Sequence, residues 1–196
     1  MKTQALYPAF VLCALLLFAC GTPSPFPLSF PNSQAADDRI VGNWKMVEDT
    51  NTNNFYEITK ADVKYGLDFQ YHVRFFNRGG SNPTHEANIF LSDFGRFGKD
   101  SGIKFINVPY WTKVDGEGDG MGWEGRGYFL VRILEADKDF SNITTATVNH
   151  PALSQFRRAA QLENFMDEHV NNPKIYSDTV HFYKTNLTTA QLRKPR

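Results

Sequence analysis

Most of the chain beyond residue 37 alternates between apolar and polar positions, which is the period of a β-strand with one buried face. The segment 68–77 has apolar side chains at every second position: Phe69, Tyr71, Val73 and Phe75. Residues 127–135 are apolar on both faces, and residues 174–185 alternate again. Shorter segments with the same period, each bounded by Gly, Asn, Pro or Asp, are 40–48, 54–59, 85–91, 103–108 and 143–148. About eight strands with turns at short spacing predict a mainly β protein, an antiparallel barrel or a sandwich.

One late segment has helical spacing instead. The residues that recur at this spacing, most of them apolar, lie between Pro151 and Pro173: Leu153, Phe156, Ala160, Phe165, Met166, His169 and Val170. Pro173 disfavours helix at Asn172, so the helix ends there and one strand follows. We expect this helix to pack on the outside or at the mouth of a barrel. A second, short helical turn is expected within 187–194.

Aromatic side chains make up 14% of the chain, and many of them fall in the expected strands. We expect Phe69, Tyr71 and Phe75 to line the barrel interior together with Phe105 and Tyr128. Such bulky side chains either fill an eight-stranded barrel or form the wall of a cavity for an apolar ligand. The pattern leaves both outcomes open, although few Gly and Ala residues face inward, where they would favour a cavity.

The first strand of the domain opens with Val41-Gly42-Asn43-Trp44, which resembles the Gly-x-Trp start of lipocalins and fatty-acid-binding proteins. The resemblance implies a lipocalin-like β-barrel with a helix before the last strand. It also implies that Gly42 and Trp44 are structural, with Trp44 closing one end of the barrel under a cation from the last strand. Lys184 and Arg193 are the candidates for that cation. The Thr-Asp-Tyr-type loop and the disulfides of many lipocalins are missing, and Trp44 as a simple core aromatic remains an alternative.

The N-terminus combines one cation, Lys2, with an apolar run of about 15 residues, which is typical of a signal peptide and short for a membrane span. The run ends in Leu17-Phe18-Ala19-Cys20-Gly21, which resembles the lipobox of bacterial lipoproteins. The resemblance implies removal of residues 1–19, acylation of Cys20 and anchoring in a bacterial cell envelope. Gly21, in place of the Asp that retains such proteins in the inner membrane, implies the outer membrane, facing the periplasm. An ordinary secretory signal and an uncleaved anchor helix remain the alternatives.

The rest of the composition sets the domain boundaries. Residues 20–37, with four prolines after Cys20, have the composition of an extended linker, which would reach about 50 Å at 3 Å per residue. The barrel domain is therefore expected at 38–196. It contains no cysteine, because Cys13 and Cys20 both precede it. With 21 basic and 21 acidic side chains, the chain gives no reason to expect nucleic acid or an anionic membrane face as a partner.

The glycine-dense segment 114–127 is acidic and is expected to form a hairpin at the barrel rim. Asp115, Glu117 and Asp119 alternate as in a calcium loop, but the twelfth position is Arg126, so we predict no metal site. Trp123 in this segment is a candidate lid over an open barrel mouth, and therefore a candidate ligand contact.

No catalytic motif is present: the chain has no Gly-x-Ser-x-Gly, phosphate-binding loop, dinucleotide fingerprint or catalytic cysteine. His72 and His181 are expected on one sheet face, which points only weakly to a metal or haem site. We therefore predict no catalytic residue and no cofactor. The sequence favours a lipid-anchored envelope protein that binds a hydrophobic small molecule or lipid. The alternatives are a filled barrel that acts as a protein-interaction or assembly module, and an enzyme.

Overall fold

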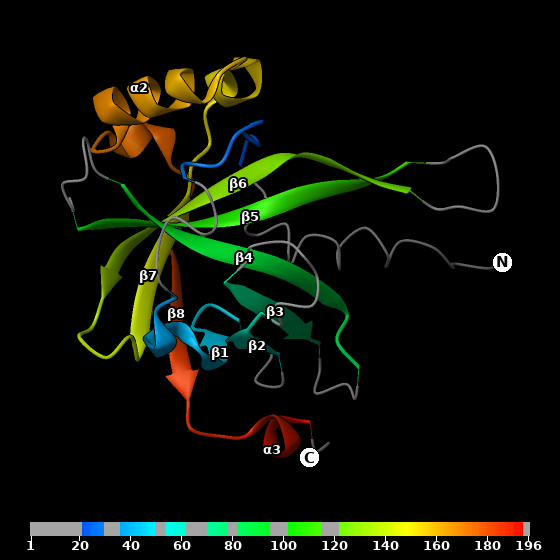
Figure 1. The fold of residues 1–196 in the computed structure, drawn as a ribbon. Coiled ribbons are helices and arrows are strands. Elements are labelled where there is room, and N and C mark those ends of the chain that lie inside the picture. The colour runs from blue at the N-terminus through cyan, green and yellow to red at the C-terminus, as the bar shows by residue number, and fades with distance from the viewer. Residues whose placement is uncertain are drawn as a thin grey trace, which may run out of the picture.

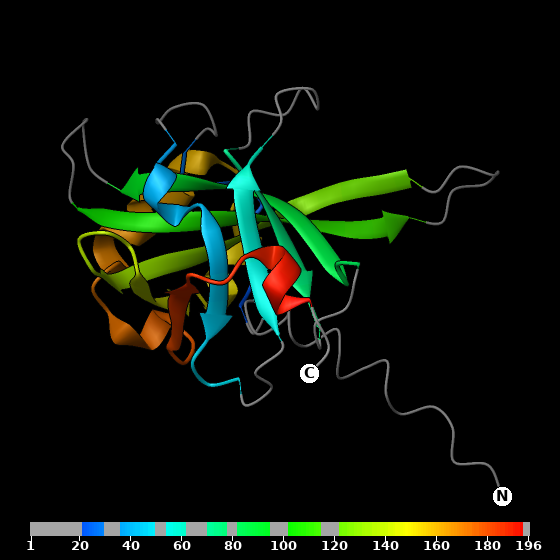
Figure 2. The same cartoon turned by 90° about the horizontal axis from the view of Figure 1, so that it is seen from below.

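The computed structural model describes residues 21–29, 36–49, 54–61, 70–77, 82–94, 102–114 and 122–193. Eight strands form one closed antiparallel barrel in which each strand pairs with its neighbours in sequence (Figures 1 and 2). They are β1 (Gly42–Met46), β2 (Phe55–Lys60), β3 (Tyr71–Phe76), β4 (His85–Phe94), β5 (Ile103–Val114), β6 (Gly122–Ala136), β7 (Asn142–Thr147) and β8 (Val180–Thr185). The predicted eight-stranded antiparallel barrel is confirmed, and it is consistent with a lipocalin-like fold.

The barrel closes where β8 pairs with β1, with Trp44 opposite Lys184 in the register. Closure gives every strand two neighbours and leaves no free edge within the barrel wall. The paired ends of β5 and β6 run out beyond the rest of the barrel (Figures 1 and 2), past a register shift between Tyr110 and Trp111. Of the predicted hairpin at 114–127, the structure describes Val114, the last residue of β5, and residues 122–127, the first part of β6.

The predicted helix before the last strand is confirmed, but it is broken into two pieces. A 3-10 helix, η5 (Pro151–Gln155), precedes α2 (Ala159–His169). The side chain of Gln161 starts α2 by accepting hydrogen bonds from the backbone N–H groups of Arg157 and Arg158, at 2.6 and 3.1 Å. Two further short helices, η6 (Pro173–Ile175) and α3 (Thr189–Leu192), flank β8, and α3 is the second helical turn that the sequence predicts.

Apolar side chains form separate clusters on the two sides of the barrel wall. Inside, the cluster includes Trp44, Tyr71, Phe75 and Ile106. Outside, Leu162 and Met166 of α2 pack fully buried against residues of the wall: Phe105, Leu130 and Val148. The helix therefore covers the outer face of the barrel, beside β5 and β6 (Figure 1). Among the described residues, none of the helices has the length and apolar character needed to cross a membrane.

Residues Gly21–Ser29, which we call the N-terminal strap, pack on the same outer face. Ser24 and Tyr128 exchange two backbone hydrogen bonds, of 2.9 and 2.7 Å, as in an antiparallel sheet. Phe26 and Leu28 join the outer apolar cluster. This differs from the free linker that the composition predicts. The prolines keep the backbone extended, which also suits pairing beside a strand, and the residues between them turn toward the barrel.

Candidate functional site: the barrel interior

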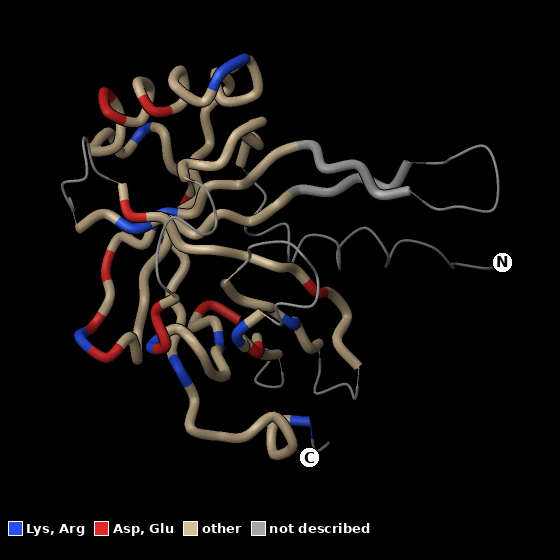
Figure 3. The backbone as a smooth tube through the Cα atoms, in the orientation of Figure 1, with Lys and Arg blue, Asp and Glu red and all other residues tan. Residues whose placement is uncertain are grey.

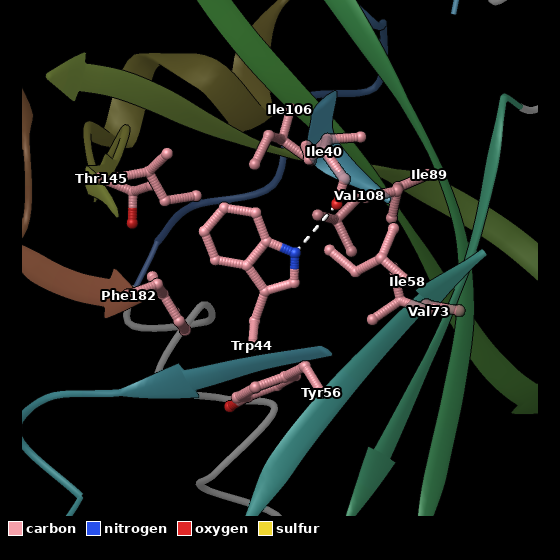
Figure 4. Close-up of a pocket in the computed structure, with 12 residues that line it drawn as sticks. Ile40, Trp44, Tyr56, Ile58, Val73, Ile89, Ile106, Val108, Thr145 and Phe182 are labelled. Atoms are coloured by element: carbon pink, nitrogen blue, oxygen red, sulfur yellow. Dashed lines mark hydrogen bonds between the residues drawn. The ribbon is translucent and has the colours of Figure 1, made fainter. Parts of the chain in front are cut away.

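One end of the barrel is closed by the segment that leads into β1. A 3-10 helix, η2 (Asp38–Ile40), precedes the strand, and the side chain of Ile40 is completely buried in the inner cluster. The indole Nε1 of Trp44 donates a hydrogen bond to the backbone oxygen of Ile40 at 2.8 Å, as Figure 4 shows. We call Asp38–Ile40 and Trp44 the plug.

The plug lies under a cation from the last strand. Lys184 Nζ is 5.1 Å from the centre of the Trp44 ring and donates to the backbone oxygen of Arg39. Gly42 has φ of +142°, and a Cβ there would be 3.2 Å from Lys184 Cε. Of the two candidate cations, Lys184 therefore occupies the position implied by the Gly-x-Trp resemblance. Arg193 lies elsewhere, 4.3 Å from the ring centre of Phe76.

Tyr71 ties the plug to the barrel wall. Its hydroxyl accepts a hydrogen bond from Asp37 N at 2.5 Å and donates one to Asp37 O at 3.1 Å. Burial raises the pKa of Tyr71 to about 12, so the hydroxyl keeps its proton at physiological pH. Asp37 in turn pairs with Arg39 at 2.6 Å. The hydrogen bonds from Arg39 hold the pKa of the Asp37 carboxyl below its usual value, although burial opposes them.

Beyond the plug, the barrel interior contains an apolar cavity of about 70 Å³ (Figure 4). Its wall is formed by Ile40, Trp44, Tyr56, Ile58, Val73, Ala87, Ile89, Ile106, Val108, Ile143, Thr145 and Phe182. The polar groups of two of these residues bond to the backbone, Trp44 to Ile40 O and Thr145 Oγ1 to Val180 O at 3.5 Å. The surface that faces the cavity is apolar, so it offers no hydrogen bond to a ligand.

The empty space follows a row of aliphatic side chains across β2, β3 and β4. Ile58 stands opposite Val73 in the register, and Val73 stands opposite Ala87. These residues point into the barrel and are nevertheless only partly buried. Because Val73 and Ala87 are small, they leave room that the Trp44 ring of the plug does not fill.

The cavity is small compared with ligand pockets of about 300–1,000 Å³. At about 70 Å³ it has room for a short or slender apolar group, such as the end of an alkyl chain. A bulkier ligand would require side chains of the wall to change rotamer. The geometry therefore favours an aliphatic ligand, or an aliphatic part of one.

The structure divides the predicted aromatic set between the two sides of the wall. Tyr71 and Phe75 lie in the inner cluster, as predicted, although neither lines the cavity. Phe105 and Tyr128 belong to the outer cluster, so their predicted place in the interior is wrong. Side chains of β5 and β6 are buried on both faces of the barrel wall. An outward aromatic residue therefore has apolar neighbours, as an inward one does, and the sequence pattern does not distinguish the two.

The side chains of two other predicted ligand contacts, Phe69 and Trp123, lie outside the described part of the chain. Phe69 lies outside the described residues. Trp123 lies within β6, where it pairs with Lys113, rather than in a connecting loop, and its side chain is outside the described part of the chain. Cys20 also precedes the first described residue.

Sequence reasoning missed the aliphatic wall of the cavity. Its signal is small or branched apolar residues two positions apart in neighbouring strands, Ala87 with Ile89 and Ile106 with Val108, beside Val73 in the strand before them. The aromatic residues are the most abundant signal in the strands, whereas the room inside a barrel is made by its smaller inward side chains.

The histidines do not assemble a second site. His72 Nδ1 lies 2.8 Å from Asn88 Oδ1, and His181 Nδ1 lies 2.5 Å from Glu48 Oε1. The two rings are on β3 and β8, with β2 and β1 between them in the barrel. Within the described part of the chain, no three His, Cys, Asp or Glu side chains are grouped so as to hold a metal ion.

Comparison with known proteins returns no match for this chain, neither among family models, nor among curated proteins, nor among solved structures.

Proposed function

We propose that this protein is a lipid-anchored bacterial envelope protein whose barrel binds the aliphatic part of a hydrophobic small molecule or lipid. The observation that carries the binding activity is the apolar cavity behind the plug. The anchor is supported by the lipobox-like Leu17-Phe18-Ala19-Cys20 after an apolar run. The proposal assigns no catalytic role to any residue.

The affinity would come from burial of apolar surface, at about 0.8 kcal/mol for each CH₂ group. Because the wall offers no polar partner to a ligand, a charged or hydrogen-bonding group is excluded from the cavity. Such a group would remain at the barrel mouth, in contact with water. The ligand class is therefore an amphiphile or hydrocarbon with at least one unbranched or lightly branched tail.

The small volume of the cavity favours a second candidate function. If side chains close around the space, the barrel is a filled scaffold that presents its outer surface to a protein partner in the envelope. The two candidates differ in one observable, because only the first predicts saturable uptake of an apolar probe by the purified protein.

Filling the cavity tests the binding proposal. Ala87→Leu adds methyl groups to the wall, and we expect binding of a fluorescent fatty-acid probe to fall at least about tenfold, equivalent to about 1.4 kcal/mol. The same change should leave stability equal or higher, because it fills empty space. Ala160→Leu, on the exposed side of α2, is the matched control and should bind as the unmodified protein does. Equal binding by the Ala87→Leu variant would place the ligand elsewhere.

The anchor has its own test. In bacteria grown with radiolabelled palmitate, the full-length protein should incorporate label, and Cys20→Ala should incorporate none and leave the membrane fraction. Cys13→Ala is the control, because this residue belongs to the segment that is removed. Membrane retention of the Cys20→Ala variant would contradict lipid anchoring.

A further inference from the structure

The N-terminal strap is built into the outer face of the barrel by polar contacts as well as apolar ones. Leu28 N donates to Asn107 Oδ1 at 3.1 Å, and Ser29 Oγ lies 2.7 Å from Ser92 Oγ. Asn107 Nδ2 completes the group by donating to Ser92 Oγ at 2.5 Å. Ser92 and Asn107 are fully buried, so the strap supplies partners that these outward polar groups of the barrel need.

Two glycines show how closely the strap fits. A Cβ on Gly127, at φ of +136°, would overlap the carbonyl oxygen of Ser24. A Cβ on Gly21 would lie 2.5 Å from Thr147 Cγ2 and 2.9 Å from the backbone oxygen of Val148. The strap therefore packs against the barrel from its first described residue, Gly21, onward.

The start of the strap lies at the end of the barrel away from the plug. Arg39, within the plug segment, is 4.6 Å from the ring centre of Phe140, in the turn between β6 and β7. Strand β7 begins beside that turn and runs to Thr147, where Gly21 packs. Thr22 contacts Asn149 just beyond, with 3.4 Å between Thr22 Oγ1 and Asn149 Oδ1.

The exposed segment that continues from Asn149 has a distinctive charge. Between Asp139 and Glu163 the sequence contains no carboxylate, although the chain has 21 acidic residues. Arg157 and Arg158, directly before α2, are exposed. Figure 3 shows this contrast, with basic residues at the start of α2 and acidic residues toward its end.

We propose that residues 149–158, together with the start of the strap, form a surface that rests on phospholipid headgroups. This inference depends on the proposed acylation of Cys20. If Cys20 carries the acyl chains, a single peptide unit of about 3.8 Å separates it from the docked Gly21. The bilayer then lies against the end of β7, where Arg157 and Arg158 meet the headgroup phosphates. The barrel end opposite the plug then faces the bilayer.

Nitroxide labels on the acylated full-length product test this orientation. Ser154→Cys places a label in η5, and Lys138→Cys places one in the turn beside the plug. In the acylated protein the sulfur of Cys20 is capped, so the introduced thiol is the one that reacts. In vesicles of phosphatidylethanolamine and phosphatidylglycerol, the Ser154→Cys label should be several-fold more accessible to oxygen than to a water-soluble nickel chelate, relative to the Lys138→Cys label. If the protein binds vesicles but both labels are equally accessible to the nickel chelate, the proposed orientation is wrong, while the lipid anchor is not contradicted.

Release of the strap provides the second variant. Ser24→Pro removes the backbone N–H that bonds to Tyr128, whereas Ser24→Ala keeps both backbone hydrogen bonds. With the strap released, the barrel no longer has a fixed orientation on the bilayer. Ser24→Pro should therefore abolish the difference in accessibility between the two labels, while the protein still sediments with vesicles. Ser24→Ala should preserve the difference. An unchanged difference in Ser24→Pro would overturn the role of the strap, and failure of the unmodified protein to sediment would overturn the proposed anchor and this inference together.

Discussion

Trp44 connects three parts of the protein: the plug, the last strand and the cavity. Its Nε1 donates to the backbone oxygen of the buried Ile40, its ring lies under Lys184, and its side chain lines the cavity. The residue is 1% exposed. A single side chain therefore closes one end of the barrel and would also contact a ligand in the cavity.

Replacing Trp44 should weaken the plug. Trp44→Phe removes the donor to Ile40 O and leaves a buried carbonyl without that partner, which we expect to lower the free energy of unfolding by about 2 kcal/mol. Urea unfolding followed by circular dichroism measures the loss. A double-mutant cycle of Trp44→Leu with Lys184→Met, in which both the ring and the cation are removed, should give a coupling of about 0.5–1 kcal/mol. A coupling of zero would show that the cation does not stabilise the ring.

Asp37 should make the plug sensitive to acid. Its carboxyl has a lowered pKa in the folded protein, chiefly because of the hydrogen bond from Arg39. The stabilisation is therefore present above the ordinary value of 3.8 and is lost as the pH falls through the lower folded pKa. Asp37→Asn should lose roughly 1 kcal/mol at pH 7 and show a flatter decline in melting temperature below pH 4. A decline as steep as that of the unmodified protein would assign the acid sensitivity to other carboxyls.

At the scale of the elements, the strap makes the outer face of the barrel a second core. Asn107 should be its most sensitive position, because it bonds to the strap through Leu28 N and to the wall through Ser92. Asn107→Ala leaves Leu28 N without its acceptor and removes the donor to Ser92 Oγ, which keeps Ser29 Oγ as a partner. We expect this loss to cost about 1–3 kcal/mol. Hydrogen exchange should then become faster at the backbone amides of the strap than in the rest of the protein.

Asn149→Ala is the control for that change. Asn149 is exposed and contacts the strap only at its first residues, so exchange in Phe26 and Leu28 should stay slow. Equal protection in the Asn107→Ala and Asn149→Ala variants would mean that apolar packing alone holds the strap.

The elements were largely predictable from the sequence, because period and length identify a strand or helix locally. The alternation in 68–77 and the helical spacing after Pro151 both correspond to observed elements. Which face of a strand is inside was less predictable. Phe105 illustrates this: α2 and the strap cover the outside of β5, so hydrophobicity does not distinguish its two faces.

The packing of the strap on the barrel was not predicted either, for a related reason. Proline-rich composition predicts an extended backbone, and the backbone is extended, but composition does not say whether that backbone is free. The signal lies in the alternation: Ser24, Phe26 and Leu28 turn to the barrel while a proline stands between each pair. A linker with no partner has no need of apolar residues at every second position.

At the scale of the whole molecule, the cavity could not be predicted, because its volume is the difference between the space enclosed by eight strands and the summed volume of their inward side chains. We expect a single exchange, Ala87→Leu, to fill much of this volume. The Gly-x-Trp segment did predict the closed end, since Gly42, Trp44 and Lys184 come together there.

The most direct test of the account is to identify what the protein carries when it is isolated from membranes. Organic extraction of the purified full-length protein, followed by mass spectrometry, should recover a noncovalent aliphatic ligand in a near-stoichiometric amount. The Ala87→Leu variant, purified in parallel, should yield much less of it. If the unmodified protein and the variant yield the same trace of lipid, and neither takes up a fatty-acid probe, the barrel does not bind an aliphatic ligand and the proposed function is wrong.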